Sequence, residues 1–212
     1  MRALPGILAL LMVADAGAQD RFFAGGAAGV ATISADARFE VPERAAASGY
    51  KPQNGPAFCP FFGLHVNDYL SFQTSYIWNS NDVRYHALRG EAFYDQAAET
   101  THQLGVVDAM LYFRRRESWV RPYLTLGTGV AHLSSDAEPA TGALGSPPGS
   151  FSVYSPVVNF SVGMDLEIRD GWKFRYMFAE TIQLNTLSKR LTPPGERNLA
   201  GFRNFFGFVK YF

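Results

Sequence analysis

Apolar and polar residues alternate along most of this chain, from about residue 21 to its end. In the segment 156–168, the even positions carry almost only apolar side chains, while most odd positions carry small or polar ones. A period of two places these two sets on opposite faces of a β-strand. The segments 70–78, 104–114 and 172–181 repeat the pattern. The pattern therefore predicts an all-β protein.

We expect eight strands, and the connections between them differ in length in a regular way. The strands are predicted near residues 21–33, 57–66, 69–79, 103–114, 119–133, 153–168, 172–184 and 201–212. Short turns of residues typical of strand reversals alternate with long hydrophilic connections. The short turns are residues 67–68, 115–118 and 169–171, and the long connections are about 34–56, 80–102, 134–152 and 185–200.

This sorting of connections by length indicates a membrane barrel. Bacterial outer-membrane barrels have short turns toward the periplasm and long loops outside the cell. The competing architecture is a soluble eight-stranded barrel of the lipocalin kind, apolar inside and polar outside. The polar faces here carry small residues and scattered charges of both signs, whereas a water-facing wall carries many Lys and Glu. We therefore predict an eight-stranded antiparallel up-and-down transmembrane β-barrel.

The first residues read as an export signal. Arg2 precedes a short apolar stretch, residues 7–14, and Ala16-Gly17-Ala18 fits the small-residue rule for signal cleavage. We expect a signal peptide over residues 1–18 and one barrel domain over residues 19–212. Beyond the signal, no stretch of the sequence has the ~18–20 apolar residues of a membrane helix.

Composition narrows the class of partner. The chain has 19 basic and 19 acidic residues, so its charge gives no reason to expect nucleic acid as a partner. Cys59 is the single cysteine, which excludes an internal disulfide. We expect Cys59 to be a small interior residue.

The segment 120–130, Val-Arg-Pro-Tyr-Leu-Thr-Leu-Gly-Thr-Gly-Val, resembles a middle strand of the small eight-stranded outer-membrane barrels of the OmpA, OmpX, OmpW and PagL kind. The terminal Phe212 is similar to the C-terminal aromatic residue of that family. The resemblance implies that Phe212 is read by the outer-membrane assembly machinery, and that outer-membrane lipids and lipopolysaccharide surround the barrel. The sequence departs from the family pattern at Lys210, where an aromatic or aliphatic residue is usual. This departure leaves the register of the last strand open.

Some members of that family are enzymes that act on lipid A, so catalytic residues must be sought. His132-Leu133-Ser134 superficially resembles the His-x-Ser pair of PagL-type deacylases. In that family the pair lies in the strand that corresponds here to residues 175–181, which contain no histidine. His65, His86 and His102 show no metal-ligand spacing. We expect no catalytic residues, no metal and no cofactor.

The polar faces of the predicted strands supply a candidate interior network. A barrel of eight strands encloses little more than its own side chains. Charges inside it must pair, because an isolated buried charge is very costly. We expect a salt-bridged interior that comprises Asp108, Arg114, Asp165, Glu167 and Arg175, with Arg203 as a further candidate.

The predicted function is a non-enzymatic one, in the structure of the envelope or in surface interactions through the long loops. The alternative is a narrow small-solute channel of the OmpW kind, and a less favoured one is an enzyme that modifies lipid A. The oligomeric state is left open.

Two local features disturb the strand pattern. Pro60 interrupts the second predicted strand, and a closed barrel has no free edge for a proline. We expect a bulge there, or a strand that begins at Phe61. The stretch 25–28, Gly-Gly-Ala-Ala, has so little contrast that the facing of the first strand is unassigned.

Overall fold

The computed structural model describes residues 21–34, 39–41, 46–144, 147–191, 193–194 and 198–212. The expected signal peptide, residues 1–18, lies outside these ranges. Within the described ranges, no helix is long and apolar enough to cross a membrane.

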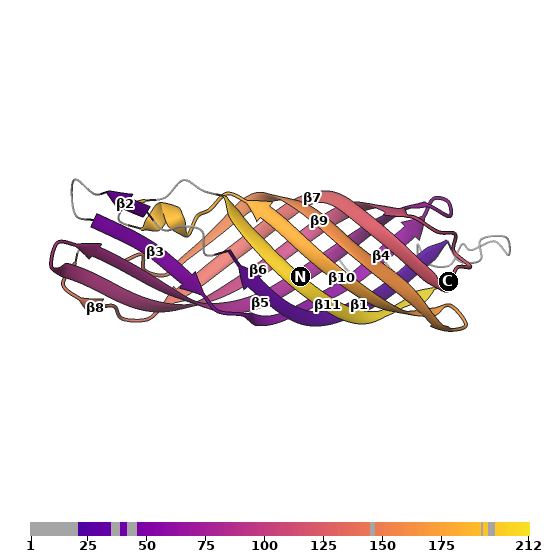
Figure 1. Ribbon diagram of the computed structural model, residues 1–212, viewed down its shortest axis with the longest axis horizontal. Helices are drawn as coiled ribbons and strands as arrows, with labels where there is room; N and C mark the ends of the chain where they lie inside the picture. The colour runs from indigo at the N-terminus through magenta and orange to yellow at the C-terminus, as the bar shows by residue number, and fades with distance from the viewer. Residues whose placement is uncertain (1–20, 35–38, 42–45, 145–146, 192, 195–197) are drawn as a thin grey trace, which may run out of the picture.

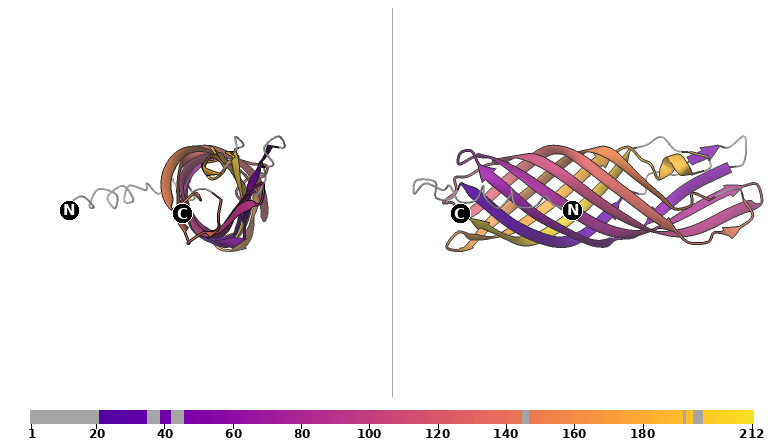
Figure 2. Two further views of the ribbon diagram at one scale, coloured as in Figure 1. Left: turned by 90° about the vertical axis from the view of Figure 1, so that its left-hand side faces the viewer. Right: turned by 180° about the vertical axis from the view of Figure 1, so that it is seen from behind.

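Eight long antiparallel strands form a closed ring, as predicted (Figures 1 and 2). The order around the ring is β1-β4-β5-β6-β7-β9-β10-β11, and β11 returns to β1 with Tyr211 opposite Phe23. The ring strands are β1 (Phe22–Ile33), β4 (Gly55–His65), β5 (Leu70–Arg89), β6 (Ala92–Tyr112), β7 (Val120–Ala137), β9 (Phe151–Arg169), β10 (Trp172–Gln183) and β11 (Leu199–Tyr211).

Three tight turns lie at one end of the barrel, which we call the short-turn end: residues 66–69, 113–119 and 170–171. In the last of them Asp170 has φ 39° and Gly171 has φ 79°. Two consecutive positive φ values characterise the hairpin turn whose twist matches the flanking strands, and Asp-Gly is a preferred sequence for it. The predicted short turns are therefore confirmed.

The opposite end, which we call the extension end, is more ordered than the sequence indicated. The expected loop over residues 80–102 is wrong, because β5 and β6 continue through it and reverse at Gly90, with φ 60°. The two strands are 20 and 21 residues long. Short elements add to this projecting hairpin: β2 (Phe39–Val41), β3 (Ala46–Pro52), β8 (Thr141–Gly142) and the 3-10 helix η3 (Ser188–Arg190) (Figure 1).

The apolar face changes sides where the hairpin projects. In the half of β5 nearer the short-turn end, the large apolar residues, such as Phe72 and Tyr76, point outward. Farther along, Val83 and Tyr85 point inward and are buried, while Asp82 points outward. An outer surface in lipid is apolar, whereas an outer surface in water is polar. This change therefore marks where the lipid-facing wall ends on the side of the extension end.

The inward-facing apolar residues of the extension pack into a cluster of their own, which we call the apolar cap. Side chains from β3, β5, β6 and β7 and from the ends of β1 and β11 meet the residues that flank η3. Its buried members are Ile33, Tyr50, Val83, Tyr85, Ala87, Tyr94, Ala98, Leu133, Leu187, Leu191 and Leu199.

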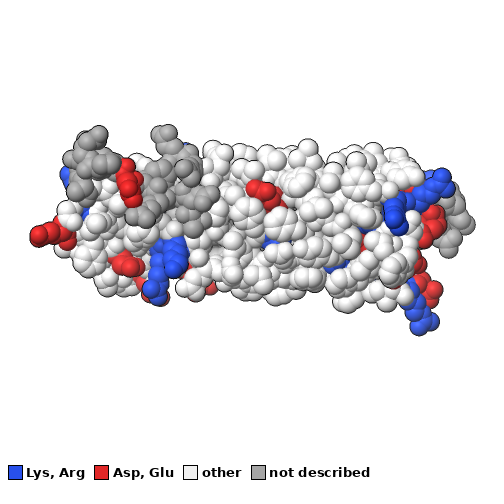
Figure 3. All heavy atoms as spheres, viewed as in Figure 1, with Lys and Arg blue, Asp and Glu red and all other residues white. Residues whose placement is uncertain are grey.

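The outer wall below the extension is apolar. Figure 3 shows a broad, mostly uncharged middle region, with charged side chains gathered toward the two ends. Large exposed side chains from every ring strand line it, including Val30, Phe62, Phe72, Val107, Leu126, Val158, Phe160, Trp172 and Phe206. An apolar outer wall around a closed ring is the pattern of a barrel in lipid.

Pro60 lies within β4 without a bulge, so the expected bulge or late strand start is wrong. The register of β4 against β5 is the same on both sides of the proline, since Phe58 faces Trp78 and Phe61 faces Ser75. The pairing of β4 with β1 runs through Pro60, which faces Gly26. The ladder with β5 lapses at residues 59–60 instead, because proline has no N–H to donate.

The weak contrast of the first strand has a steric cause. Gly25 faces inward opposite Phe61, and Phe23 faces inward opposite Gly63. A Cβ atom at Gly63 would overlap the Phe23 ring, and one at Gly25 would overlap the Phe61 ring. Each glycine therefore makes room for the ring across from it.

The last strand keeps a regular register despite Lys210. Tyr211 points inward, and Lys210 points outward over the Trp172 ring, 5.8 Å from its centroid. The backbone of Phe212 is hydrogen-bonded to that of Phe22 in both directions, which closes the barrel at the short-turn end.

Candidate functional site: the barrel interior

A buried ion pair occupies the interior near the short-turn end. Asp165 on β9 and Arg175 on β10 are register partners, and both side chains are fully buried. Arg175 Nε donates to Asp165 Oδ1 at 2.6 Å, and its Nη2 donates to Oδ2 at 2.7 Å. Gln73 Oε1 and the Tyr112 hydroxyl accept the remaining Arg175 bonds, at 2.7 and 3.0 Å. Such a doubly bonded, fully partnered pair is the form in which buried charges are tolerated.

Arg121 completes this cluster, and sequence reasoning missed it. It is fully buried and donates to the Tyr211 hydroxyl at 2.7 Å, which itself donates to Asp165 at 2.8 Å. Its guanidinium also stacks on Tyr112, 3.7 Å from the ring centroid. Its odd position on β7, in phase with Tyr123 and Thr125, was the available signal for an inward-facing side chain.

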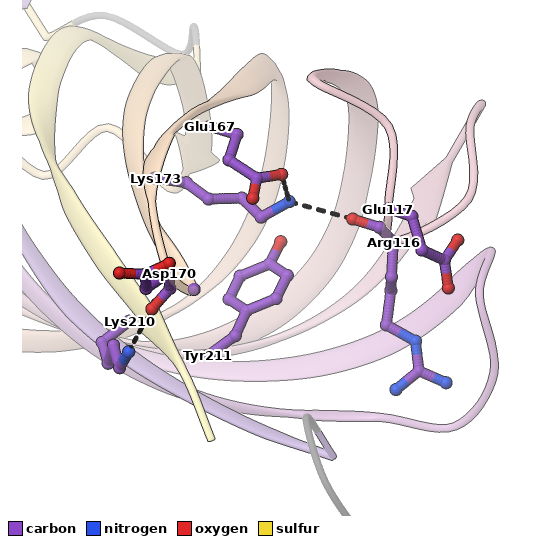
Figure 4. Close-up of a pocket in the computed structure, with 8 residues that line it drawn as sticks. Arg116, Glu117, Glu167, Asp170, Lys173, Lys210 and Tyr211 are labelled. Atoms are coloured by element: carbon purple, nitrogen blue, oxygen red, sulfur yellow. Dashed lines mark hydrogen bonds and ion pairs between the residues drawn. The ribbon is translucent and has the colours of Figure 1, made fainter.

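The mouth of the barrel at the short-turn end holds an open cavity of about 760 Å³ (Figure 4). Lys173 reaches across it, with Nζ 3.4 Å from Glu167 Oε2 and 2.9 Å from the backbone oxygen of Arg116. Lys173 is nearly buried, whereas Glu167 is about one-third exposed. Glu167 therefore belongs to the rim and is not part of the Asp165–Arg175 cluster.

A second polar cluster lies farther from the short-turn end and has no carboxylate among the described residues. Arg203 on β11 is buried and donates to Asn79 at 3.0 Å, to Thr181 at 2.8 Å and to His102 Nδ1 at 3.2 Å. His102 Nε2 lies 3.1 Å from Gln183 Oε1. Because Nδ1 accepts and Nε2 donates, His102 is held in one neutral tautomer. Neutral dipoles thus solvate the Arg203 charge.

Mostly apolar side chains lie between the two clusters, and this was not expected from the small and polar inward faces. On β5, β6, β10 and β11 the positions between the clusters include large buried apolar groups, namely Ile77, Leu104, Val106, Met110, Met177, Phe205 and Val209. Polar groups interrupt this layer on one side. There Asn159 Nδ2 donates a hydrogen bond to Asp108 Oδ1 at 2.7 Å, and the hydroxyl oxygens of Thr125 and Ser161 are hydrogen-bonded at 2.6 Å. Cys59 is buried in the same layer, where an interior position was expected.

The predicted interior set is therefore divided among several places. Asp165 and Arg175 are brought together, Asp108 lies apart from them with Asn159, and Glu167 lies at the rim. Arg114 departs from the expectation, because its side chain is exposed beyond the end of β6 and its backbone oxygen faces the Arg121 side chain instead. The strand ends two residues before Arg114, so the alternation no longer fixes its direction.

His132 and Ser134 both lie on the outward face of β7. His132 Nε2 is 2.6 Å from Ser152 Oγ, and its ring lies against Tyr154 with centroids 4.5 Å apart. Among the described residues no carboxylate is hydrogen-bonded to His132. The same ranges contain no group of three or more His, Cys, Asp or Glu side chains that could hold a metal ion.

Comparison with known proteins agrees with this architecture. The family model described as the outer membrane protein beta-barrel domain matches residues 4–195. Among solved structures, Neisserial surface protein A (NspA) shares 15% identity at a TM-score of 0.53, over 90% of this chain and 97% of that one. Ail, the attachment invasion locus protein of Yersinia pestis, shares 9% identity at a TM-score of 0.51, over 91% and 99%. No protein in the search of curated sequences matches the chain.

The two structural likenesses concern the fold, and the family match covers most of the chain. The family match, together with the apolar outer wall and the closed ring, places the protein in the cell outer membrane. The chain belongs to the family of outer membrane protein β-barrel domains.

Proposed function

We propose that this protein is a non-enzymatic, non-conducting barrel that presents its extension end at the cell surface. The observation that carries the proposal is the filled interior. A polar cluster around Asp165, a mostly apolar layer, a second polar cluster around Arg203 and the apolar cap follow one another along the barrel. An ion crossing the mostly apolar layer would have to shed its water, which is very costly.

The projecting hairpin supports a role outside the membrane. The strands β5 and β6 continue well past the wall that faces lipid, and β2, β3, β8 and η3 stiffen the projection (Figure 1). Its outward residues are mainly polar, as a surface in water requires. Long external segments and short periplasmic turns are the rule for such barrels, so the extension end faces outward in this proposal. Lipopolysaccharide is the partner expected around its base.

The absence of catalytic activity is also a proposal. The hydroxyl of Ser152 beside His132 is one element of a nucleophile–base arrangement, but a third group that orients the base completes such sites. His132 has no carboxylate partner in the part of the chain that the structure describes. This supports a role for the pair in packing the wall near Tyr154.

Recording of purified protein in planar lipid bilayers tests the main proposal. A filled interior predicts no discrete current steps. Reproducible steps that persist after repurification would support the narrow channel instead.

A further inference from the structure

The turn between β6 and β7 carries three consecutive arginines between two exposed aromatic residues. It reads Phe-Arg-Arg-Arg-Glu-Ser-Trp over residues 113–119. Phe113 is 56% exposed and Trp119 is 70% exposed. Exposed aromatic rings at a barrel end mark the boundary between lipid tails and headgroups. The arginines between them therefore lie at headgroup depth.

The backbone of this turn is held from inside the barrel. Lys173 Nζ donates to the Arg116 oxygen at 2.9 Å, and Arg121 Nε donates to the Arg114 oxygen at 3.4 Å (Figure 4 shows the Lys173 bond). The Arg116 side chain pairs with Asp68 of the adjacent turn at 3.0 Å. The turn is thus fixed by its backbone and by Arg116, which leaves the other two arginines directed outward.

Arg114 and Arg115 are both exposed. Among the described residues, Arg114 has no ion-pair or side-chain hydrogen-bond partner. Arginine stays charged at any working pH, and the neighbouring Tyr69, followed by Asp68 and Glu117, raises the pKa of Arg115 further. The turn contains one acidic residue, Glu117, and Asp68 of the adjacent turn is paired with Arg116. The three arginines therefore outnumber the acidic side chains beside them.

The excess of positive charge extends over the described part of the short-turn end. Residues 21, 66–69, 113–119, 167–173 and 210–212 carry seven basic and four acidic side chains, although the chain as a whole is neutral. Such an end attracts anions. Arginine forks fit phosphate oxygens bidentately, and arginine near a bilayer surface favours anionic lipid by about 1 kcal/mol each, or about fivefold.

We propose that the turn 113–119 is a binding site for the headgroup of an anionic phospholipid such as phosphatidylglycerol, with Arg114 and Arg115 as the phosphate ligands. Phe113 and Trp119 anchor the turn beside the lipid. The site lies in the inner leaflet if the short-turn end faces the periplasm, and that part of the inference rests on the proposed orientation.

The test measures the association of spin-labelled phosphatidylglycerol, relative to spin-labelled phosphatidylethanolamine, with the folded protein in bilayers. The variant Arg114→Gln/Arg115→Gln removes two charges from the turn. The matched control, Arg84→Gln/Arg89→Gln, removes two exposed charges from the extension end. Heat-dependent gel mobility checks that every protein is folded.

The wild type and the control should associate more strongly with phosphatidylglycerol than with phosphatidylethanolamine. In the turn variant, this ratio of association should fall about fivefold or more. Raising the salt concentration should weaken the wild-type preference, because the site is exposed. A turn variant that keeps the full preference, or a control that loses as much, would overturn the proposal. In the reconstituted bilayer both leaflets contain both lipids, so the result does not depend on the orientation of the barrel. Epitope accessibility on cells tests that orientation separately.

Discussion

Asp165 and Arg175 face each other on β9 and β10 and are joined by two hydrogen bonds of 2.6 and 2.7 Å inside the barrel. Replacing Asp165 by Asn leaves the Arg175 charge buried without its counter-charge. Breaking a buried pair in this way costs about 3–5 kcal/mol. We expect urea unfolding of the refolded barrel in lipid or detergent to show a loss of this size for Asp165→Asn.

The double variant Asp165→Leu/Arg175→Met should recover part of that stability, because the Arg175 charge is removed together with its partner. The recovery should be incomplete, because buried Arg121 still loses the carboxylate to which its partner Tyr211 donates. Arg84→Gln, at an exposed arginine of the extension end, is the neutral control. Wild-type stability in Asp165→Asn would show that the pair does not hold the interior together.

The glycines that face interior rings should tolerate no side chain. Gly63→Ala places a Cβ against the Phe23 ring, and overpacking of this kind costs about 1–3 kcal/mol. Gly26→Ala is the matched control, because a Cβ there meets nothing within 4 Å. Unfolding in urea should separate the two variants, and Phe23→Leu should partly rescue Gly63→Ala. Equal stability of the two alanine variants would contradict this packing.

Phe212 should affect assembly more than stability. Its side chain is 56% exposed, while its backbone bonds to Phe22 do not depend on the side chain. For Phe212→Ala we expect an unfolding free energy within about 1 kcal/mol of wild type, and a clear fall in the amount of folded barrel in isolated outer membranes. Phe208→Ala, at an exposed aromatic residue within β11, is the control. Equal membrane levels of both variants would argue against recognition of the terminal residue.

Epitope tags test the orientation. A tag inserted between Gly90 and Glu91, in the turn of the projecting hairpin, should be bound by antibody on intact cells. A tag inserted in the turn 115–118 should be bound after the outer membrane is permeabilised. The reverse pattern would place the short-turn end outside.

The lipid-facing strands were predictable from sequence because each keeps one parity of large apolar residues. The projecting hairpin was not, because the apolar parity of β5 changes from Trp78 to Val83 when the surroundings of the wall change from lipid to water. When the apolar residues move from even to odd positions within one strand, neither stretch of alternation is long enough to be recognised. The segment then resembles a hydrophilic loop.

The interior was predictable in part. Asp165 and Arg175 were identified because their strands have strong contrast. Arg121 was missed because the inward positions of β7 pass from Arg121 and Tyr123 to small residues and offer no clear polar face. The apolar layer was missed for a similar reason: inward residues such as Phe205 lie in β11 beside the outward Phe206, and adjacent aromatics give no contrast.

Single-channel recording shows whether the interior of the barrel is closed to ions. Wild-type protein that is shown by gel mobility to be folded should give no discrete current steps at any applied voltage at which the bilayer is stable. The recording should include the same preparation at high salt, where even a narrow pore conducts measurably. Stepwise currents of one reproducible size would contradict the filled interior and would make the protein a channel.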